Sequence, residues 1–504
     1  MEKHSNPGNV NELKWERELK ASLYSMAGQL QKTIKPWRVP NRVFRVEDYG
    51  AIANSDKLCT EAIQAAIDDC SNSGGGYVRF SFGDYLTGTL VLKSNVMLEI
   101  ESRSRILGSP NLVDYPEHIA KKPTVMESWM NMKYSLIFAE EVENIGFCGG
   151  GIIDGQGGSA NFTGRESIGP ITERPFLIRV LECKNVAVYD ITLQNSGSWM
   201  QDYINCDNVY VSNIKVKNWG NWNNDGIDLD GCRNVVVRDS SFSCIDDALC
   251  LKGAGLRDGE NILIENCTVI TQCNGLKFGT DTQAGVRDVL VRNVTLGGPA
   301  DIVTPSWTWR IDTKDRDSAL YASTGISWTW RIDTKDRDSA LYASTGISWM
   351  SVDGGKVENL LVEDSEIHHV YCPVFLRIND RGRTRPELPK PGVGELRKLI
   401  FKNIKGTDCF NRPSIIQGHP DEPVTDVVFR DFEISTFGDV SKEQIDDKYP
   451  AYMKDAYPDA QGYPLYLPAS GFWMDNFKDI HFINVDVKPT REDVRDFKYI
   501  VEHK

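Results

Sequence analysis

The chain has 504 residues, 40% of them hydrophobic and 25% charged, which is the composition of an ordinary folded protein. Its formal net charge of −14 argues against a nucleic-acid or anionic-membrane partner, because such partners need surface patches of Lys and Arg. No apolar run approaches the roughly 20 residues of a membrane span. The first nine residues, MEKHSNPGN, lack a signal peptide's apolar region, which leaves a cytoplasmic protein or one whose signal was removed.

Two helices are expected in the N-terminal part of the chain. Apolar residues recur every three or four positions from Asn11 to Ile34 and predict a helix. We expect this segment, within residues 1–42, to cover the open end of a single domain formed by residues 43–504. A second helix is predicted over Thr60–Cys70, followed by short strands and, over Arg491–Val501, by a short terminal helix.

The strands carry a repeat in which Asn or Asp precedes Val, Ile or Leu and an alternating apolar run. From Asn185 onward the first gaps between repeats are 23, 26, 27 and 27 residues. A period of this size with one short strand per unit predicts a solenoid. The Asn and Asp residues are expected to bond the neighbouring backbone at the turns. They are Asn144, Asn185, Asn208, Asn234, Asn261, Asp288, Asn359, Asp426 and Asp479.

The cysteines and histidines give no sign of a disulfide scaffold or a metal site. Twelve cysteines are few for this length, and Cys183, Cys206 and Cys232 share one phase of the repeat, which favours stacking inside the coil over disulfides. There is no CxxC pair, and the seven histidines have no zinc-binding spacing. No metal is therefore expected.

One segment is duplicated without a single change. Ser306–Ile326 recurs as Ser327–Ile347, which indicates a recent duplication, an engineered insertion or a sequence-assembly error. Asp288 and Asn359 are 71 residues apart, and 50 without one copy, or about two repeats. The copy forms an extra coil or lengthens a loop, and its charged WRIDTKDRD stretch favours the loop. Its tryptophans either line a sugar-binding rim or pack in the core: Trp307, Trp309, Trp328 and Trp330.

Three aspartates head two successive apolar-alternating runs. Asp225 lies 21 residues before the pair Asp246–Asp247. On successive coils these carboxylates would converge, so at least one pKa should rise and one proton be held near neutral pH. Glycoside hydrolysis uses such a set, in which one carboxylic acid protonates the leaving oxygen and one carboxylate activates water. The alternative, for an Asp-Asp pair alone, is a solvated turn.

These motifs resemble glycoside hydrolase family 28, the polygalacturonase-like enzymes. Asn223–Asp225 matches the family's Asn-Xaa-Asp motif and Asp246–Asp247 its Asp-Asp motif, with the family's spacing, and the similarity extends from about Arg45 to Val494. Further matching stretches are DYGA at 48–51, NSGSW at 195–199 and VDGGKVENL at 352–360.

The resemblance implies an all-β, right-handed parallel β-helix with an N-terminal capping helix. It implies an inverting hydrolase of a pectin-type or related plant or algal glycan, without a cofactor and with an oligo- or polysaccharide as partner. Asp246 would be the general acid, and Asp225 with Asp247 would hold and activate the water. It also suggests a periplasmic or secreted location for a chain whose signal was removed.

The chain departs from the family at two motifs. Cys273-Asn274-Gly275 stands where the family has Gly-His-Gly, and the phase-matched strand Gly346–Val352 lacks the Arg-Ile-Lys that binds galacturonate. We therefore expect a divergent branch in which Lys252 and Lys277 supply positive charge. Arg377, in the most basic stretch, is read as part of a carboxylate- or sulfate-binding pocket or as a solubilising residue. The substrate-binding candidates are Asn224, Trp199, Lys252, Asn274, Lys277 and Arg377.

Two other functions fit the same residues. A polysaccharide lyase would use the three aspartates to hold calcium and Lys252 or Lys277 as the base. A lyase product carries a new ultraviolet-absorbing double bond, which separates it from a hydrolase product. A non-catalytic glycan-binding β-helix is the third possibility; the missing histidine favours it and the three retained aspartates argue against it.

Overall fold

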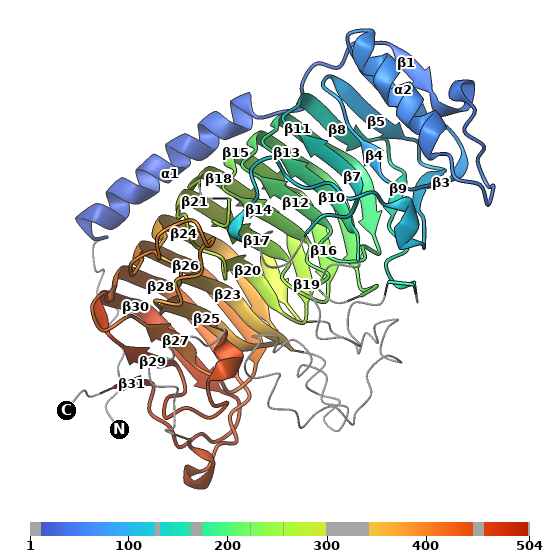
Figure 1. The fold of residues 1–504 in the computed structure, drawn as a ribbon. Coiled ribbons are helices and arrows are strands. Elements are labelled where there is room, and N and C mark those ends of the chain that lie inside the picture. Colours follow the sequence, from blue (N-terminus) through green and yellow to red (C-terminus); the bar gives the residue numbers. More distant parts are fainter. Residues whose placement is uncertain are drawn as a thin grey trace.

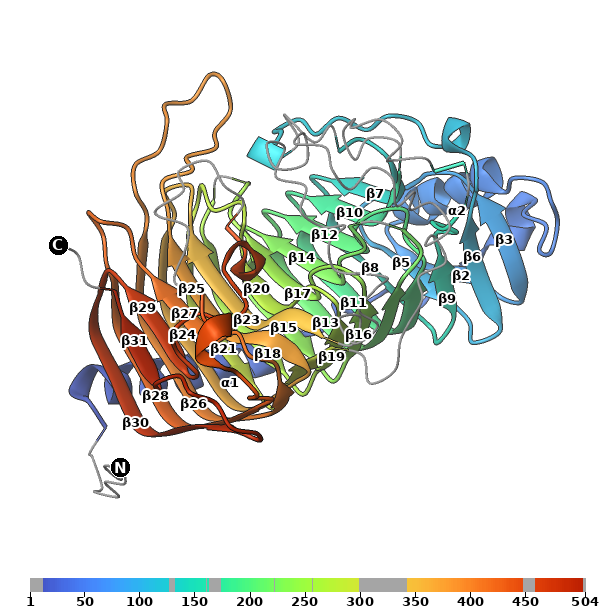
Figure 2. The same ribbon diagram turned by 90° about the horizontal axis from the view of Figure 1, so that it is seen from below.

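The computed structural model describes residues 12–126, 132–159, 161–162, 174–221, 223–255, 257–298, 342–446 and 458–501. Within them the chain winds into a right-handed parallel β-helix, as predicted (Figures 1 and 2). Successive coils stack through two long sheets, one of 19 strands and one of 12. No helix of this part is long and apolar enough to cross a membrane.

The smaller sheet carries one short strand from each coil. Its members are β4 (Leu90–Val91), β7 (Ser135–Glu140), β10 (Phe176–Leu181), β12 (Gln201–Ile204), β14 (Ile227–Asp230), β17 (Leu249–Lys252), β20 (Asn274–Phe278), β23 (Ala343–Ser351), β25 (Val370–Ile378), β27 (Ser414–Gln417), β29 (Phe472–Asp475) and β31 (Lys498–Ile500). The predicted terminal helix over Arg491–Val501 is wrong, because this segment ends in β31, which pairs with β29.

The larger sheet forms the rest of each coil. Its members are β1 (Val43–Arg45), β2 (Gly76–Phe80), β3 (Gly83–Thr87), β5 (Val96–Ile100), β6 (Ser104–Gly108), β8 (Glu143–Cys148), β9 (Ile152–Asp154), β11 (Lys184–Gln194), β13 (Asp207–Asn218), β15 (Arg233–Arg238), β16 (Ser241–Cys244), β18 (Gly259–Glu265), β19 (Thr268–Thr271), β21 (Val286–Arg292), β22 (Thr295–Gly297), β24 (Lys356–His368), β26 (Glu395–Cys409), β28 (Val424–Thr436) and β30 (Phe477–Pro489). Short 3₁₀ helices η1 (Val46–Tyr49), η2 (Leu112–Asp114), η7 (Lys442–Gln444) and η8 (Ala460–Gly462) lie between strands.

Stacked apolar side chains fill the interior of the coil. Equivalent residues of successive strands lie in register, so each contacts its counterparts above and below: Val209, Val235, Ile262, Val289 and Leu360. All twelve cysteines are free and buried, and Cys183, Cys206 and Cys232 lie in this core. The prediction of stacked cysteines is therefore confirmed.

The repeated Asn residues form a ladder of side-chain hydrogen bonds along the β-helix. The Nδ2 atom of Asn208 donates to Asn185 Oδ1 at 2.9 Å, and its own Oδ1 accepts from Asn234 Nδ2 at 3.2 Å. Asn144, Asn261 and Asn359 make equivalent bonds. The expected bonds to neighbouring backbone are thus replaced by side-chain bonds. Each Asn has positive φ, 61° at Asn208, a conformation that Asn adopts more readily than most residues.

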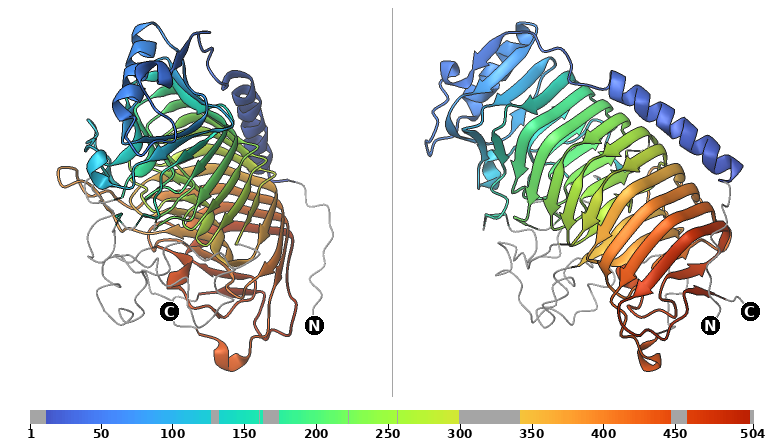
Figure 3. Two further views of the ribbon diagram at one scale, coloured as in Figure 1. Left: turned by 90° about the vertical axis from the view of Figure 1, so that its right-hand side faces the viewer. Right: turned by 180° about the vertical axis from the view of Figure 1, so that it is seen from behind.

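The helix α1 (Lys14–Thr33) lies along the flank of the β-helix and does not cover its end (Figure 3). Its buried stripe packs on a row of outward-facing apolar residues, one from each of five coils: Val236, Leu263, Leu290, Leu361 and Ile400. The prediction that this helix covers the open end of the β-helix is therefore wrong. The end is instead covered by α2 (Thr60–Asn72), which packs on η1, β1 and β2. The division of the chain after residue 42 remains a prediction.

The duplicated segment adds no coil to the stack. Asp288 and Asn359 lie on adjacent coils, where Asn359 Nδ2 donates to Asp288 Oδ1 at 2.9 Å, and β21 pairs directly with β24. These two residues, 71 positions apart, therefore lie on consecutive coils, and the prediction of an extra coil is wrong. The end of the second copy, Ala343–Ile347, lies in β23. The rest of both copies, with the four tryptophans, lies outside the described residues.

Candidate active site

The register of the smaller sheet brings the predicted aspartates together. Ile227 pairs with Leu249 and Leu249 with Leu276, so the residues two positions earlier lie on neighbouring coils. These residues are Asp225, Asp247 and Asn274, and the next coil continues the row with Thr345. The predicted placement of Asp225 and the Asp246–Asp247 pair on successive coils is confirmed.

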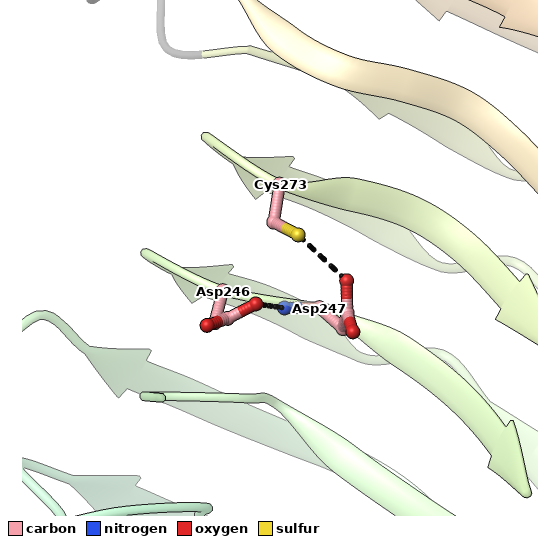
Figure 4. Close-up of side chains that lie close together, drawn as sticks. All are labelled: Asp246, Asp247 and Cys273. Carbon is pink, nitrogen blue, oxygen red and sulfur yellow. Dashed lines mark hydrogen bonds between the residues drawn. The ribbon is translucent and has the colours of Figure 1, made fainter. Parts of the chain in front are cut away.

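Asp247 is held by three donors from the following coil. Lys277 Nζ lies 2.6 Å from its Oδ2, while Asn274 Nδ2 and Cys273 Sγ lie 2.6 Å and 2.7 Å from its Oδ1. Figure 4 shows the Cys273 thiol directed at this carboxylate. Burial acts to raise the pKa of Asp247, but Lys277 and Lys252 outweigh it and hold that pKa at about 2. The surroundings of Asp247 therefore favour its ionised form.

Asp246 lies beside Asp247 at the head of β17. The backbone N–H of Asp247 donates to Asp246 Oδ1 at 2.9 Å, which fixes the orientation of this carboxyl group (Figure 4). One oxygen of each aspartate and the Cys273 sulfur lie within 4.8 Å of one another. The two carboxyl groups are thus closer together than the roughly 6.5–9.5 Å that is typical of inverting glycosidases, and nearer to the roughly 5 Å of retaining ones.

Asp225 has the opposite electrostatic environment. Its side chain is buried, and among the described residues none donates a hydrogen bond to its Oδ1. Burial, followed by the charges of Asp228, Asp246 and Asp247, raises the pKa of Asp225 well above its usual value. One site therefore contains a carboxyl group whose pKa is lowered and one whose pKa is raised.

Three further buried carboxylates were missed by the sequence analysis. Burial raises the pKa of Asp228 and of Asp230 to about 7, and raises that of Asp202 strongly. Asp202 and Asp228 are direct neighbours on β12 and β14. The signal was present, since in IDLD the apolar Ile227 and Leu229 occupy the interior and leave both aspartates on the outer face.

The two predicted lysines are already engaged within the protein. Lys252 Nζ lies 3.4 Å from Asp228 Oδ1 and 4.5 Å above the ring of Trp199, and Lys277 contacts Asp247. Both lysines are almost fully buried. Their positive charge therefore acts first on the carboxylates of the site.

The other predicted substrate-binding residues, Asn224, Asn274 and Arg377, lie in three different surroundings. Asn224 is fully buried, and its Nδ2 donates to the backbone carbonyls of Ser196 and Ser198, so it fixes the turn beneath Asp225. Asn274 bridges Asp247 and the hydroxyl of Thr345, which donates to Asn274 Oδ1 at 2.6 Å. Arg377 lies on β25, three strands beyond β17 in the smaller sheet.

The donor set does not suit calcium. Ca²⁺ takes six to eight hard oxygen ligands, whereas the group of closest potential ligand atoms contains the Cys273 thiol. One oxygen of Asp247 is also occupied by the Lys277 ammonium group. These carboxyl groups are therefore better suited to exchanging protons with a bound molecule than to forming the calcium cluster of a lyase.

Comparison with known proteins finds similarity over part of the chain. Residues 113–320 match the model of glycosyl hydrolases family 28. A probable polygalacturonase of Vitis vinifera is 26% identical over 266 residues, which cover 49% of this chain and 53% of that protein. An exo-poly-alpha-D-galacturonosidase of Dickeya chrysanthemi is 30% identical over 135 residues, or 25% of this chain and 22% of that protein.

A solved structure extends the likeness in fold over most of the chain. The exopolygalacturonase of Thermotoga maritima superposes with a TM-score of 0.63 at 21% identity, covering 82% of this chain and 91% of that one. The chain spans about half the length of the grapevine relative and about a fifth of the Dickeya one. Over residues 113–320 the chain is similar to the glycosyl hydrolases family 28, and over most of its length it has the fold of a polygalacturonase.

Proposed function

We propose that the protein is a glycoside hydrolase that cleaves a pectin-type glycan by acid/base catalysis. Inversion at the anomeric carbon is proposed from the family resemblance and not from the spacing of Asp246 and Asp247. The observation that carries the proposal is the contact of Lys277 with Asp247, which lowers the pKa of that carboxyl group in a site where the pKa of Asp225 is raised. Acid/base hydrolysis requires carboxyl groups whose environments push their pKa values apart. The polygalacturonase relatives support the substrate class.

Asp246 acts as the general acid in this proposal. Its carboxyl group protonates the glycosidic oxygen as the bond to the leaving sugar breaks. Asp247 accepts a proton from the attacking water, because its low pKa keeps it ionised. Asp225 holds that water in place, and its raised pKa lets it donate a hydrogen bond. Lys277, Asn274 and Cys273 position Asp247.

Asn274 and Lys277 bind Asp247 in the part of the site where the family has its motif histidine. In this chain Asn274 occupies the position of the family's motif histidine and contacts Asp247 directly, and Lys277 adds a charge to the same carboxylate. Substitution at this motif therefore changes how the base is held without removing the base. This argues for catalysis over the non-catalytic alternative.

One experiment tests the proposal as a whole. The purified protein is incubated with a panel of pectic oligosaccharides, and new reducing ends, absorbance of unsaturated products and the anomer released are followed together. We expect new reducing ends, no ultraviolet-absorbing product and inversion at the anomeric carbon. A product with a double bond would establish a lyase instead. Retention would indicate a covalent intermediate on one of the aspartates.

A further inference from the structure

Arg377 lies on the same outer face of the smaller sheet as the site but several coils away. Its neighbours in the chain, Leu376 and Ile378, point into the core, so Arg377 points outward. In register it lies between Met350 of β23 and Gln417 of β27. Tyr463, from the segment that contains η8, covers one side of it, with the ring centroid 5.5 Å from Cζ.

The guanidinium group of Arg377 is buried, and the described part of the chain offers it no anion. Arg377 is 2% exposed, and none of the described residues makes a hydrogen bond with its Nε or Nη2. In the part of the chain that the structure describes, no carboxylate lies within 4.0 Å of it; the Oδ2 atom of Asp475, two strands further on, accepts from Gln417 Nε2 at 3.1 Å. A desolvated charge without a partner is among the costliest groups that a fold can bury.

A second arginine four residues later shows how the chain satisfies such a group internally. Arg381 Nε donates to Asp353 Oδ1 at 2.9 Å, and its Nη2 donates to Asp353 Oδ2. The two side chains are similarly buried. Among the described residues, Arg377 therefore differs from Arg381 in having no carboxylate partner and not in how deeply it is buried.

We propose that Arg377 binds the carboxylate of an acidic sugar residue at a subsite remote from the cleaved bond. Nε and Nη2 lie on one edge of the guanidinium plane, the edge that receives a carboxylate through two parallel hydrogen bonds. β25 is three strand spacings from β17, or roughly 14 Å, which is further than one sugar ring reaches. The inference rests on the proposed function and adds that the substrate is acidic at least one residue beyond the scissile bond.

The test measures binding in an Asp246→Asn background, in which the ligand is not turned over. Titration calorimetry uses hexagalacturonate, a rhamnogalacturonan hexasaccharide, the carboxyl-reduced form of each, and digalacturonate. Adding Arg377→Met should weaken the binding of at least one acidic hexasaccharide by about 10- to 100-fold, the effect of losing a charge-assisted bond. The carboxyl-reduced forms and digalacturonate should be unaffected. Arg377→Lys should recover part of the loss.

Stability separates a ligand-binding role from a structural one. Arg377→Met should leave the melting temperature unchanged or raise it, because an unpaired buried charge is removed. The matched control Arg381→Met should lower it, because Asp353 is left buried without its partner. A melting temperature that falls as far in Arg377→Met as in Arg381→Met would overturn the proposal.

The remaining outcomes are also decisive. Three results would each overturn the subsite. The first is an equal loss of affinity for acidic and carboxyl-reduced ligands, and the second is no loss for either acidic hexasaccharide. The third is that neither acidic hexasaccharide binds to the Asp246→Asn protein in which Arg377 is unchanged. Binding that depends on Arg377 in a protein that hydrolyses no glycan would contradict the proposed hydrolase alone. Hydrolysis of acidic glycans without dependence on Arg377 would contradict the subsite alone.

Discussion

Lys277 Nζ lies 2.6 Å from Asp247 Oδ2, and both side chains are almost completely buried on neighbouring coils. Burial alone would favour a neutral carboxylic acid at this position, so the ammonium group decides the protonation state. The pair therefore fixes which carboxylate can accept a proton. Lys277 was expected to bind substrate through its charge. Its contact with Asp247 gives it a second role, which is to position the proposed base.

Replacing Lys277 should shift the pH dependence of the reaction. In Lys277→Met the pKa of Asp247 should rise from about 2, since burial is no longer opposed by the adjacent charge. Asp247 would then be protonated at mildly acidic pH, so kcat/KM should fall there first and the acidic limb of the profile should move to higher pH. The profile is measured on a cleaved oligosaccharide.

The conservative variant Lys277→Arg provides the control. It keeps a positive charge, so its acidic limb should stay near that of the unchanged protein even if the rate falls. Parallel profiles for Met and Arg variants would show that the charge does not set the ionisation of Asp247. If Lys277→Met changed only KM, and only for acidic glycans, Lys277 would act in substrate binding and not through Asp247.

Asp246→Asn should lower turnover about 10²–10⁴-fold, because the amide has nearly the same shape but cannot deliver a proton. An aryl glycoside with a good leaving group needs little protonation, so the loss should be much smaller on such a substrate. Asp247→Asn should lose activity on both substrates. The reverse pattern, with the aryl substrate rescuing Asp225→Asn, would make Asp225 the acid.

Asp225 should lower the stability of the fold at neutral pH. Its folded-state pKa is raised above the ordinary 3.8, so the folded protein binds the proton more tightly than the unfolded chain does. The stability that comes from this proton is present below about pH 4 and is lost as pH rises toward the folded pKa. Asp225→Asn should remove this pH-dependent loss of stability, because the amide does not ionise. The variant should be more stable than the unchanged protein at pH 7 by about 1–3 kcal/mol and should be inactive. Urea unfolding at pH 5 and pH 8 measures it, and equal pH slopes for both proteins would contradict it.

The Asn ladder gives a prediction about the fold itself. Asn208 combines a positive φ with two ladder hydrogen bonds, so Asn208→Ala should destabilise the protein by about 2–4 kcal/mol. Asn208→Gly loses the same bonds but adopts positive φ without strain, and should cost less. Denaturant unfolding of both variants measures the difference. If Gly cost as much as Ala, the ladder bonds alone would explain the position.

The sequence predicted the coil and most of the site because both follow from periodicity. Repeats of about 22–27 residues place each position above its counterpart, so Asp225 and Asp247, which are 22 residues apart, were expected on neighbouring coils once the strands were recognised. The burial of Asn224 and the ion pairs of Lys252 and Lys277 did not follow, because alternation gives the face of a side chain and not its partner. The position of α1 was missed because its apolar stripe shows that it packs but not on which surface.

Deleting Ser327–Ile347 should leave the stack of coils intact. The two copies are identical, so after the deletion Ala322–Ile326 supplies the residues now contributed to β23 by Ala343–Ile347. Asn359 would still reach Asp288, because their coils are adjacent already. We expect a soluble protein whose melting temperature changes little. As a control, removing the 27 residues from Asn234 to Glu260 takes out Asp246 and Asp247 with one coil and should abolish activity and lower stability by several kcal/mol. An insoluble product of the first deletion would show that the second copy supports the fold, contrary to the register of β21 with β24.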